Sequence, residues 1–158
     1  MRRVAAVLLV LTLTACAEKA KAPTAAQLAH RSYVAKVNAI CAKYDRLAAS
    51  IPEPKDDASP TQVRTFLRQA IPWAERWRRE VKAVVPPAHE RAEVAERLWA
   101  PMDDLVKRMH DLSANVDRAL RSHSQADVQR VENAAKALGD NITGSEGWLD
   151  DFGLTACS

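Results

Sequence analysis

The sequence predicts an all-α protein whose residues 32–158 form an antiparallel up-down four-helix bundle. Three observations predict this fold class. Large apolar residues recur at intervals of three and four over four long stretches, the spacing of one helix face. Prolines and N-cap residues separate these stretches. No window longer than a few residues alternates apolar and polar side chains as a strand does.

The chain opens with the features of a secretory signal peptide. Arg2 and Arg3 are basic, residues 4–13 are almost all apolar, and small residues follow. An apolar run of this length is too short to span a bilayer. We therefore expect export and removal of the leader.

Residues 13–16, Leu-Thr-Ala-Cys, resemble the lipobox of bacterial lipoproteins. The resemblance implies that residues 1–15 are cleaved and that Cys16 is diacylated. Membrane lipid is then a partner through this cysteine, and the protein is anchored at the extracytoplasmic face of the cell membrane. Residues 16–31 are rich in Ala and Lys, so we expect the acylated cysteine to be followed by a flexible tether.

The first predicted helix begins at Ser32 and ends before Pro52. Cys41 falls on or beside its apolar face, so we expect this cysteine to be buried. The large side chains of this face are Tyr33, Val37, Ile40, Tyr44, Leu47 and Ile51.

The second predicted helix begins after Ser59, which has the features of an N-cap. Pro60 occupies the first helical position and Gln62 the third, a pattern that favours a capping box. The helix ends at Pro86-Pro87. Pro72 lies inside it without disturbing the apolar pattern, which predicts a kink rather than an end.

The third predicted helix follows Pro87 and continues to Leu120 through Pro101, where we expect a second kink. Its apolar residues keep their three-four spacing on both sides of the proline. They are Val94, Leu98, Met102, Leu105, Met109, Leu112, Val116 and Leu120.

The fourth predicted helix starts at Ser124 and ends at Gly153-Leu154, a pattern typical of a left-handed cap with an apolar contact. Its apolar face is expected to hold Val128, Val131, Ala135, Leu138, Ile142, Leu149 and Phe152. Three glycines, Gly139, Gly144 and Gly147, either divide this helix in two or allow close packing against a neighbour.

The three cysteines of the chain leave one pair if Cys16 carries lipid, as the lipobox resemblance implies. Thiols oxidise readily outside the cytoplasm, so we expect a disulfide between Cys41 and Cys157. Closing a loop of about 117 residues stabilises a fold by roughly 4 to 5 kcal/mol through chain entropy. Two buried free thiols are the alternative.

The composition argues against nucleic-acid binding. The chain has 23 basic and 20 acidic residues, and loss of Arg2 and Arg3 with the leader leaves 21 against 20. A nearly neutral, exported protein lacks the basic field that nucleic acid requires. The hydrophobic fraction of 47% is typical of a globular domain.

A search for catalytic or metal-binding patterns finds none, so we expect a protein that is not an enzyme and has no cofactor or metal. No histidine has a glutamate three positions before it, as helical di-iron sites require. Residues 89–93 open like a His-Glu-x-x-His zinc motif but end in Glu. Residues 144–147, Gly-Ser-Glu-Gly, lack the spacing of a nucleophile elbow.

Five basic residues share an arc of about 100° on the second predicted helix. Such a face either meets phosphate groups of lipid or of an anionic wall polymer, or is solvated. The five are Arg64, Arg68, Arg78, Arg79 and Lys82.

The two internal prolines predict a cleft. Pro72 and Pro101 each lie about fourteen residues from the Pro86-Pro87 turn, so in an antiparallel hairpin the two kinks face each other. Kinks separate helix axes, and indoles at the same level would line the gap. The alternative is that these indoles fill the kinks as core. They are Trp73, Trp77 and Trp99.

The layout as a whole is similar to small helical lipoproteins of actinobacteria. It comprises a lipobox, a tether, a helix with Ile40-Cys41 and a closing Gly153-to-Ser158 segment. This resemblance implies location and architecture and no catalytic residues. The function we expect is a non-enzymatic binding module for an envelope protein or a small apolar ligand. A structural or stress-protective envelope component without a pocket is the alternative.

Overall fold

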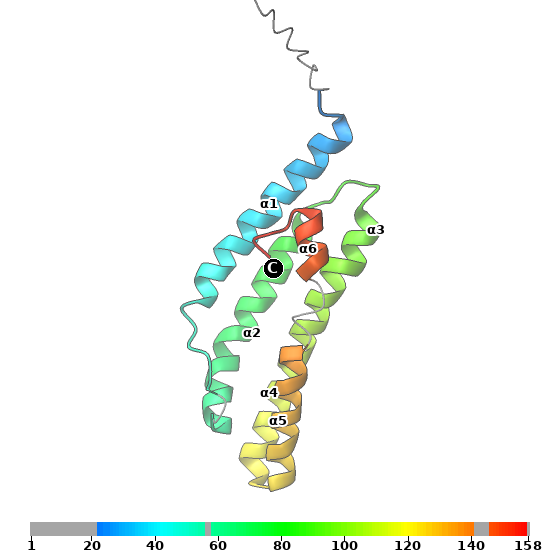
Figure 1. Cartoon of the computed structure of the whole chain (residues 1–158). Coiled ribbons are helices and arrows are strands. Elements are labelled where there is room, and N and C mark those ends of the chain that lie inside the picture. The colour runs from blue at the N-terminus through cyan, green and yellow to red at the C-terminus, as the bar shows by residue number, and fades with distance from the viewer. Residues whose placement is uncertain (1–21, 56–57, 141–145, 158) are drawn as a thin grey trace, which may run out of the picture.

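The computed structural model describes residues 22–55, 58–140 and 146–157 (Figure 1). Every regular element within these ranges is helical, which confirms the all-α prediction. None of the helices in the described ranges combines the length and the hydropathy needed to cross a membrane. The predicted leader and Cys16 lie outside the described residues.

Helix α1 spans Ala25–Ala48 and begins earlier than predicted. The Thr24 hydroxyl accepts a hydrogen bond from the Gln27 amide at 3.2 Å, and the Gln27 side chain accepts one from the Thr24 amide at 2.8 Å. This capping box starts a helix in an alanine-rich segment that needs no apolar face to begin. The predicted tether over residues 16–31 is therefore wrong for residues 25–31. The last turn was also misassigned, since Leu47 is 46% exposed.

Helix α2 spans Pro60–Ala83, and its predicted start is confirmed. The Ser59 hydroxyl accepts from the Gln62 amide at 3.4 Å, while the Gln62 side chain accepts from the Ser59 amide at 2.8 Å. Pro72 lies within the helix, and the chain remains helical on both sides of it. The prediction that this proline does not end the helix is thus confirmed.

The third predicted helix is one continuous helical run in three parts. These are α3 (Arg91–Val94), the π-helical η1 (Ala95–Trp99) and α4 (Ala100–Ser122). The amide of Ala100 donates to the carbonyl of Ala95, five residues back. In a regular α-helix the ring of Pro101 would meet the carbonyl four residues before it, and the wider π turn moves the carbonyls out of this alignment. The helix therefore continues through Pro101, as predicted, with a π turn that the sequence pattern did not reveal.

The fourth predicted helix is two helices, α5 (Gln125–Asp140) and α6 (Glu146–Phe152). Of the glycines in question, Gly144 lies outside the described residues. Gly147 lies in α6, and a Cβ added there would meet nothing within 4 Å. Close packing is therefore the wrong interpretation of Gly147. Ala135, predicted to be buried, is exposed on α5.

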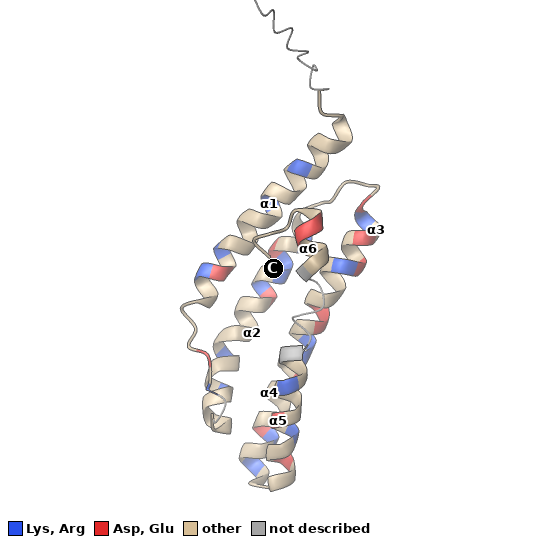
Figure 2. Cartoon of the chain, viewed as in Figure 1, with Lys and Arg blue, Asp and Glu red and all other residues tan. Residues whose placement is uncertain are grey.

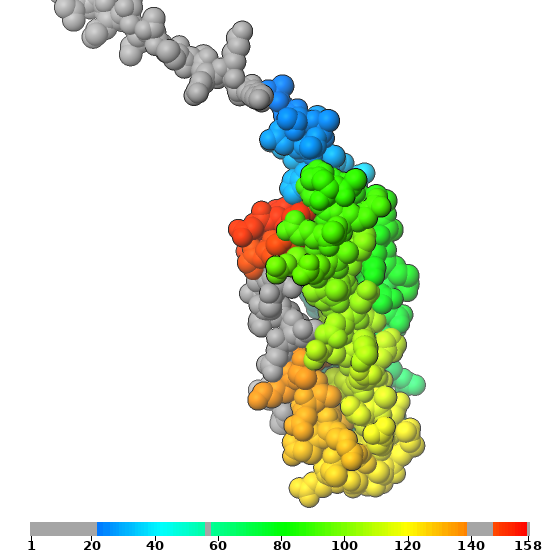
Figure 3. Space-filling model, turned by 90° about the vertical axis from the view of Figure 1, so that its right-hand side faces the viewer, coloured from blue at the N-terminus to red at the C-terminus, as the bar shows by residue number. Residues whose placement is uncertain are grey.

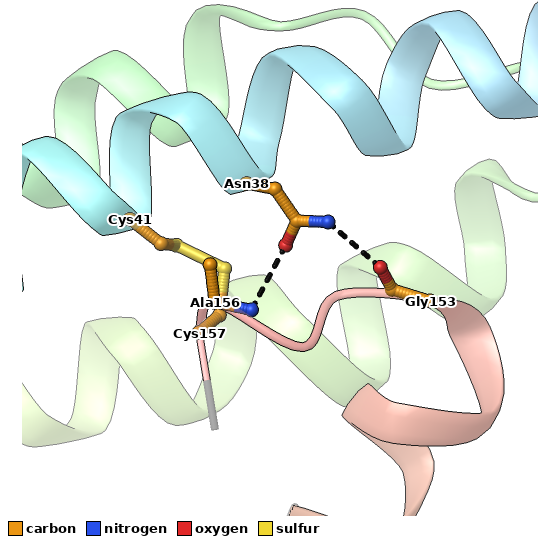
Figure 4. Close-up of a disulfide and its surroundings, with 5 residues drawn as sticks. All are labelled: Asn38, Cys41, Gly153, Ala156 and Cys157. Carbon is orange, nitrogen blue, oxygen red and sulfur yellow. Dashed lines mark hydrogen bonds between the residues drawn. A yellow bond between two sulfur atoms is a disulfide. The ribbon is translucent and has the colours of Figure 1, made fainter.

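The C-terminal segment folds back onto α1. Gly153 ends α6 with a φ of 91°, and Leu154 is fully buried, which confirms the left-handed cap. Cys157 forms a disulfide with Cys41, with 5.2 Å between their Cα atoms, as predicted. Asn38 bridges the segment, because its amide nitrogen donates to the Gly153 carbonyl at 2.8 Å and its oxygen accepts from the Ala156 amide at 3.1 Å (Figure 4).

The buried side chains form two clusters along the length of the molecule. α6 lies toward the N-terminal end of α1, and α5 lies toward the opposite end (Figure 3). The disulfide cluster comprises Tyr33, Val37, Cys41, Val81, Val94, Leu98, Met102, Leu149 and Leu154. The distal cluster comprises Leu67, Ala70, Ala74, Val106, Met109, Leu112, Val116, Ala119 and Val131.

Candidate functional site

The register between α2 and α4 differs from the prediction. His110 lies 3.0 Å from Glu75, and Lys82 lies 2.7 Å from Asp103. These pairs show which residues of α2 and α4 lie at the same level. The midpoint between paired residues falls several positions after the Pro86-Pro87 turn in the sequence. The cause is the connection over residues 84–90, none of which belongs to a helix, so that α3 begins only at Arg91.

Consequently the two prolines do not face each other. Pro72 lies one turn before Glu75, whereas Pro101 lies at the level of Lys82. About ten residues of α2 separate these levels, which corresponds to about 15 Å along a helix. The prediction of matched kinks is therefore wrong.

The three indoles are engaged in packing. Trp73 donates its Nε1 proton to the Tyr44 carbonyl at 3.0 Å and stacks on Trp77 with ring centroids 5.9 Å apart. Trp99 packs against the disulfide cluster, and Lys82 Nζ lies 5.9 Å from its ring centroid. None of the four hollows described below is lined by an indole. The structure places these side chains in core packing rather than in a cleft.

The predicted basic face is largely ion-paired at its C-terminal end. Arg78 and Lys82 contact Asp103 at 3.3 and 2.7 Å, and Arg79 lies 3.9 Å from Glu75. Basic and acidic residues are mixed along α2 and α4 (Figure 2). A hollow of about 640 Å³ is lined by Arg78, Arg79, Lys82, Ala83 and Asp103. Arg64 and Arg68 lie in the other half of α2, so the five do not form one continuous unpaired face.

A polar cluster joins α1 to the α2–α3 connection. His30 Nδ1 lies 3.0 Å from Glu90 Oε1, and His89 Nε2 lies 3.3 Å from the same oxygen. The Glu90 side chain is only 14% exposed. No group of three or more His, Cys, Asp or Glu side chains in the described ranges is arranged to hold a metal ion. A hollow of about 350 Å³ beside the cluster is lined by Ala26, Gln27, His30, Arg31, His89 and Glu90.

Two buried polar atoms in this region have no hydrogen-bond partner within the described part of the chain. They are Glu90 Oε2 and the Tyr33 hydroxyl. Burial raises the pKa of Tyr33 to about 12, and the negative charge of Glu90 acts in the same direction. Tyr33 therefore remains a neutral phenol at physiological pH. Sequence reasoning missed the cluster because His30 and Glu90 are 60 residues apart.

A second feature that the sequence did not reveal is a hollow beside the distal cluster. It has a volume of about 620 Å³ and lies between the α1–α2 connection and helices α2, α4 and α5. Its apolar lining residues are Pro54, Ala58, Val63, Phe66, Leu112, Val131, Ala135 and Leu138, and its charged ones are Glu53, Lys55, Glu132 and Lys136. We call this the distal hollow. Apolar walls with a few charged groups are typical of small-molecule sites, which span about 300–1,000 Å³.

No family model matches the chain, and no curated protein or solved structure matches it either. The choice between the hollows therefore depends on the geometry and chemistry of the chain itself. Eight of the twelve residues that line the distal hollow are apolar, and they come from the α1–α2 connection and from α2, α4 and α5.

Proposed function

We propose that the protein is a lipid-anchored, extracytoplasmic binding protein without enzymatic activity, and that it takes a small apolar ligand in the distal hollow. The observation that carries the proposal is the lining of this hollow. Phe66, Leu112 and Val131 supply apolar surface from three different helices. Its charged lining residues carry both signs, Lys55 and Lys136 with Glu53 and Glu132, so the lining favours an apolar ligand without a net charge.

The proposed anchor is supported by the Leu-Thr-Ala-Cys resemblance at residues 13–16. Only eight residues, 17–24, separate Cys16 from the first residue of α1. Eight extended residues reach at most about 28 Å, so the start of α1 would remain close to the bilayer. The start of α2 and helix α5, which line the distal hollow, lie toward the other end of the domain, so the hollow would be distant from the membrane (Figure 1).

We further infer that the architecture is an up-down four-helix bundle whose fourth position is shared by α5 and α6. Contacts between α1 and α2, between α2 and α4, and between α4 and α5 support this inference, as consecutive long helices are neighbours. α5 contributes Val131 to the distal cluster, and α6 contributes Leu149 to the disulfide cluster. In this arrangement α5 and α6 together take the place of the fourth helix, α5 over the distal cluster and α6 over the disulfide cluster.

The ligand proposal is tested by filling the hollow. Ala135 is exposed on α5 and lines the hollow, so Ala135→Trp should obstruct it without disturbing the core. Ala126 is exposed on the same helix and does not line the hollow, which makes Ala126→Trp the matched control. Binding of N-phenyl-1-naphthylamine, an uncharged apolar fluorophore, should fall about tenfold in the first variant and stay unchanged in the second. Equal binding by both variants and the wild type would reject the hollow as the site.

The anchor is tested by Cys16→Ser. Without its acylation site the protein should leave the membrane fraction or keep its leader. Mass spectrometry of the wild-type protein should show a diacylated N-terminal cysteine. Normal processing and membrane partitioning of Cys16→Ser would refute the anchor and leave the ligand proposal standing on its own test.

A further inference from the structure

Large apolar side chains are strongly exposed at one end of the molecule. Leu28 is 53% exposed in α1, and Val85 is 72% exposed in the α2–α3 connection. The start of α1 and this connection lie at the same end of the domain (Figure 1). Leu47, 46% exposed, is near the opposite end of α1.

The two segments that carry Leu28 and Val85 are held together. A hollow of about 530 Å³ between them is lined by Ala29, Ser32, Tyr33 and Lys36 of α1 and by residues 83–87. The contact of His30 with Glu90 links the same two segments at 3.0 Å. The exposed valine lines this hollow and the exposed leucine lies outside it, on a segment that the same contacts hold at this end of the domain. We call residues 22–29 and 84–89 the apolar tip.

The apolar tip contains no Asp, Glu, Lys or Arg. Exposed basic residues follow its two segments, Arg31 and Lys36 on α1 and Arg91 at the start of α3. One acidic residue, Glu90, comes directly after the second segment, but its side chain is only 14% exposed and contacts His30 and His89. Glu93, Asp150 and Asp151 belong to α3 and α6 and not to the tip. Apolar side chains followed by cations are the arrangement of a surface that lies in the interfacial layer of a bilayer.

We propose that the apolar tip is a membrane-contact surface, and that Leu28 and Val85 insert into the bilayer that holds Cys16. The orientation rests on the proposed anchor, because the chain runs from the tip to Cys16 in fewer than ten residues. Lys19 and Lys21 lie within this short stretch and add attraction to anionic head groups. Because this segment is short and ends at the proposed lipid-bearing Cys16, the surface that the apolar tip contacts is the bilayer.

The consequence is a domain held by a second attachment besides its lipid. A flexibly tethered domain samples many orientations, whereas insertion of two side chains from separate segments fixes one. Moving a leucine or valine side chain from water into an apolar environment changes a partition coefficient by about tenfold or more. In the proposed orientation the distal hollow points away from the membrane, where a ligand can reach it.

The experiment uses the mature chain with Cys16→Ser, so that lipid acylation contributes nothing. Flotation with vesicles of phosphatidylglycerol and phosphatidylcholine is compared for this chain and for the same chain with Leu28→Ser and Val85→Ser. The matched control carries Leu47→Ser, a leucine outside the tip whose exposure, 46%, is similar to that of Leu28. Near-ultraviolet circular dichroism establishes that all three chains are folded.

We expect the tip variant to bind at least tenfold more weakly and the Leu47 variant to bind like the parent. The difference should persist in about 1 M salt, where the Debye length falls to about 3 Å and attraction of the lysines is screened. Equal binding of tip variant and parent, an equal loss in the Leu47 control, or complete loss of parent binding in high salt would each overturn the proposal. Since acylation is absent throughout, none of these outcomes bears on the anchor itself.

Discussion

The two halves of the domain are closed by different means. In the disulfide cluster α1, α6 and the C-terminal segment cover the core, and a covalent bond together with two Asn38 hydrogen bonds holds them in place. The distal cluster has no such covalent link. It depends on α2, α4 and α5, and three of its nine buried residues are alanines that allow close helix approach. The half around the disulfide cluster is covalently linked, whereas the half around the distal cluster has a hollow beside its core.

This difference indicates that the two halves of the domain have different roles. The half nearer the proposed anchor is built for a fixed geometry, since its ends cannot separate while the disulfide is intact. The distal half can adjust the spacing of its helices at lower cost, because packing alone sets it. A binding hollow in the adjustable half and an attachment surface in the fixed half agree with the functions proposed above. The predictions below test the contrast from the largest expected effect to the smallest.

Removing the disulfide should abolish the difference in rigidity between the two halves of the domain. In Cys41→Ala with Cys157→Ala we expect the free energy of unfolding to fall by about 4 kcal/mol, because a loop of more than 100 residues regains its entropy in the unfolded chain. Urea denaturation measures the change, and hydrogen exchange should show α6 opening before α2 and α4. Cys16→Ser is the control and should leave the free energy unchanged. A loss below 1 kcal/mol would show that packing alone closes this half.

A cavity in the distal cluster should act locally. Leu67 is fully buried, and Leu67→Ala should cost about 3 kcal/mol of unfolding free energy through lost burial and a residual cavity. The exposed Leu47 serves as control, as Leu47→Ala should change stability by less than about 0.5 kcal/mol. Hydrogen exchange should accelerate in α4 and α5 and stay slow around the disulfide. Uniform acceleration along the chain would mean that the two halves unfold as one unit.

The two hydrogen bonds of Asn38 should contribute measurably to the stability of the C-terminal segment. In Asn38→Ala the Gly153 carbonyl and the Ala156 amide both lose their partner, which should cost about 2 kcal/mol. Asn38→Asp keeps the acceptor for Ala156 but places a carboxylate oxygen against the Gly153 carbonyl, so it should be no more stable than Asn38→Ala. Thermal unfolding with the disulfide intact provides the measurement. If Asn38→Ala matches the wild type, the disulfide alone positions the C-terminal segment.

Tyr33 should make the disulfide half sensitive to alkali. Its pKa is raised to about 12, so the folded state favours the neutral phenol. The resulting stabilisation is complete below pH 10, the ordinary pKa of tyrosine, and is lost as the pH rises from 10 toward 12.

Tyr33→Phe should therefore change stability little at pH 7, since its hydroxyl has no partner in the described residues, and should decline less above pH 10. Tyr44, the other tyrosine, donates to Glu80 at 2.7 Å. Tyr44→Phe should instead lose about 1 kcal/mol already at pH 7. Urea midpoints across this pH range test both. If the urea midpoints of Tyr33→Phe and the wild type fall in parallel above pH 10, ionisation of Tyr33 does not cause the loss of stability.

Features determined by neighbouring residues were the ones that the sequence predicted. The Ser59-to-Gln62 cap and the Gly153-Leu154 cap each depend on a few adjacent positions, so the local pattern was sufficient. The disulfide followed from counting cysteines. The start of α1 carries the same kind of capping pattern in Thr24 and Gln27, but no apolar face accompanies it, so apolar spacing does not mark this start.

Features that depend on distant segments were not predictable from the sequence. The seven residues 84–90 hold two prolines that mark a turn without fixing its length, and this length set the register of α2 against α4. The predicted cleft failed for that reason. The distal hollow and the contact of Glu90 with His30 unite residues from several elements, for which no local pattern exists.

The link between Cys41 and Cys157 also decides what a protease can release. These cysteines are 116 residues apart, and α2 through α6 lie between them. A single cut anywhere in that span, including the connection between α1 and α2, leaves both pieces joined through sulfur. The nicked domain would thus stay attached to α1 and to any lipid at the N-terminus, and a gel would reveal two fragments only after reduction. Release of the domain from the proposed anchor would require a cut before Cys41, a second cut within the span, or a reductant.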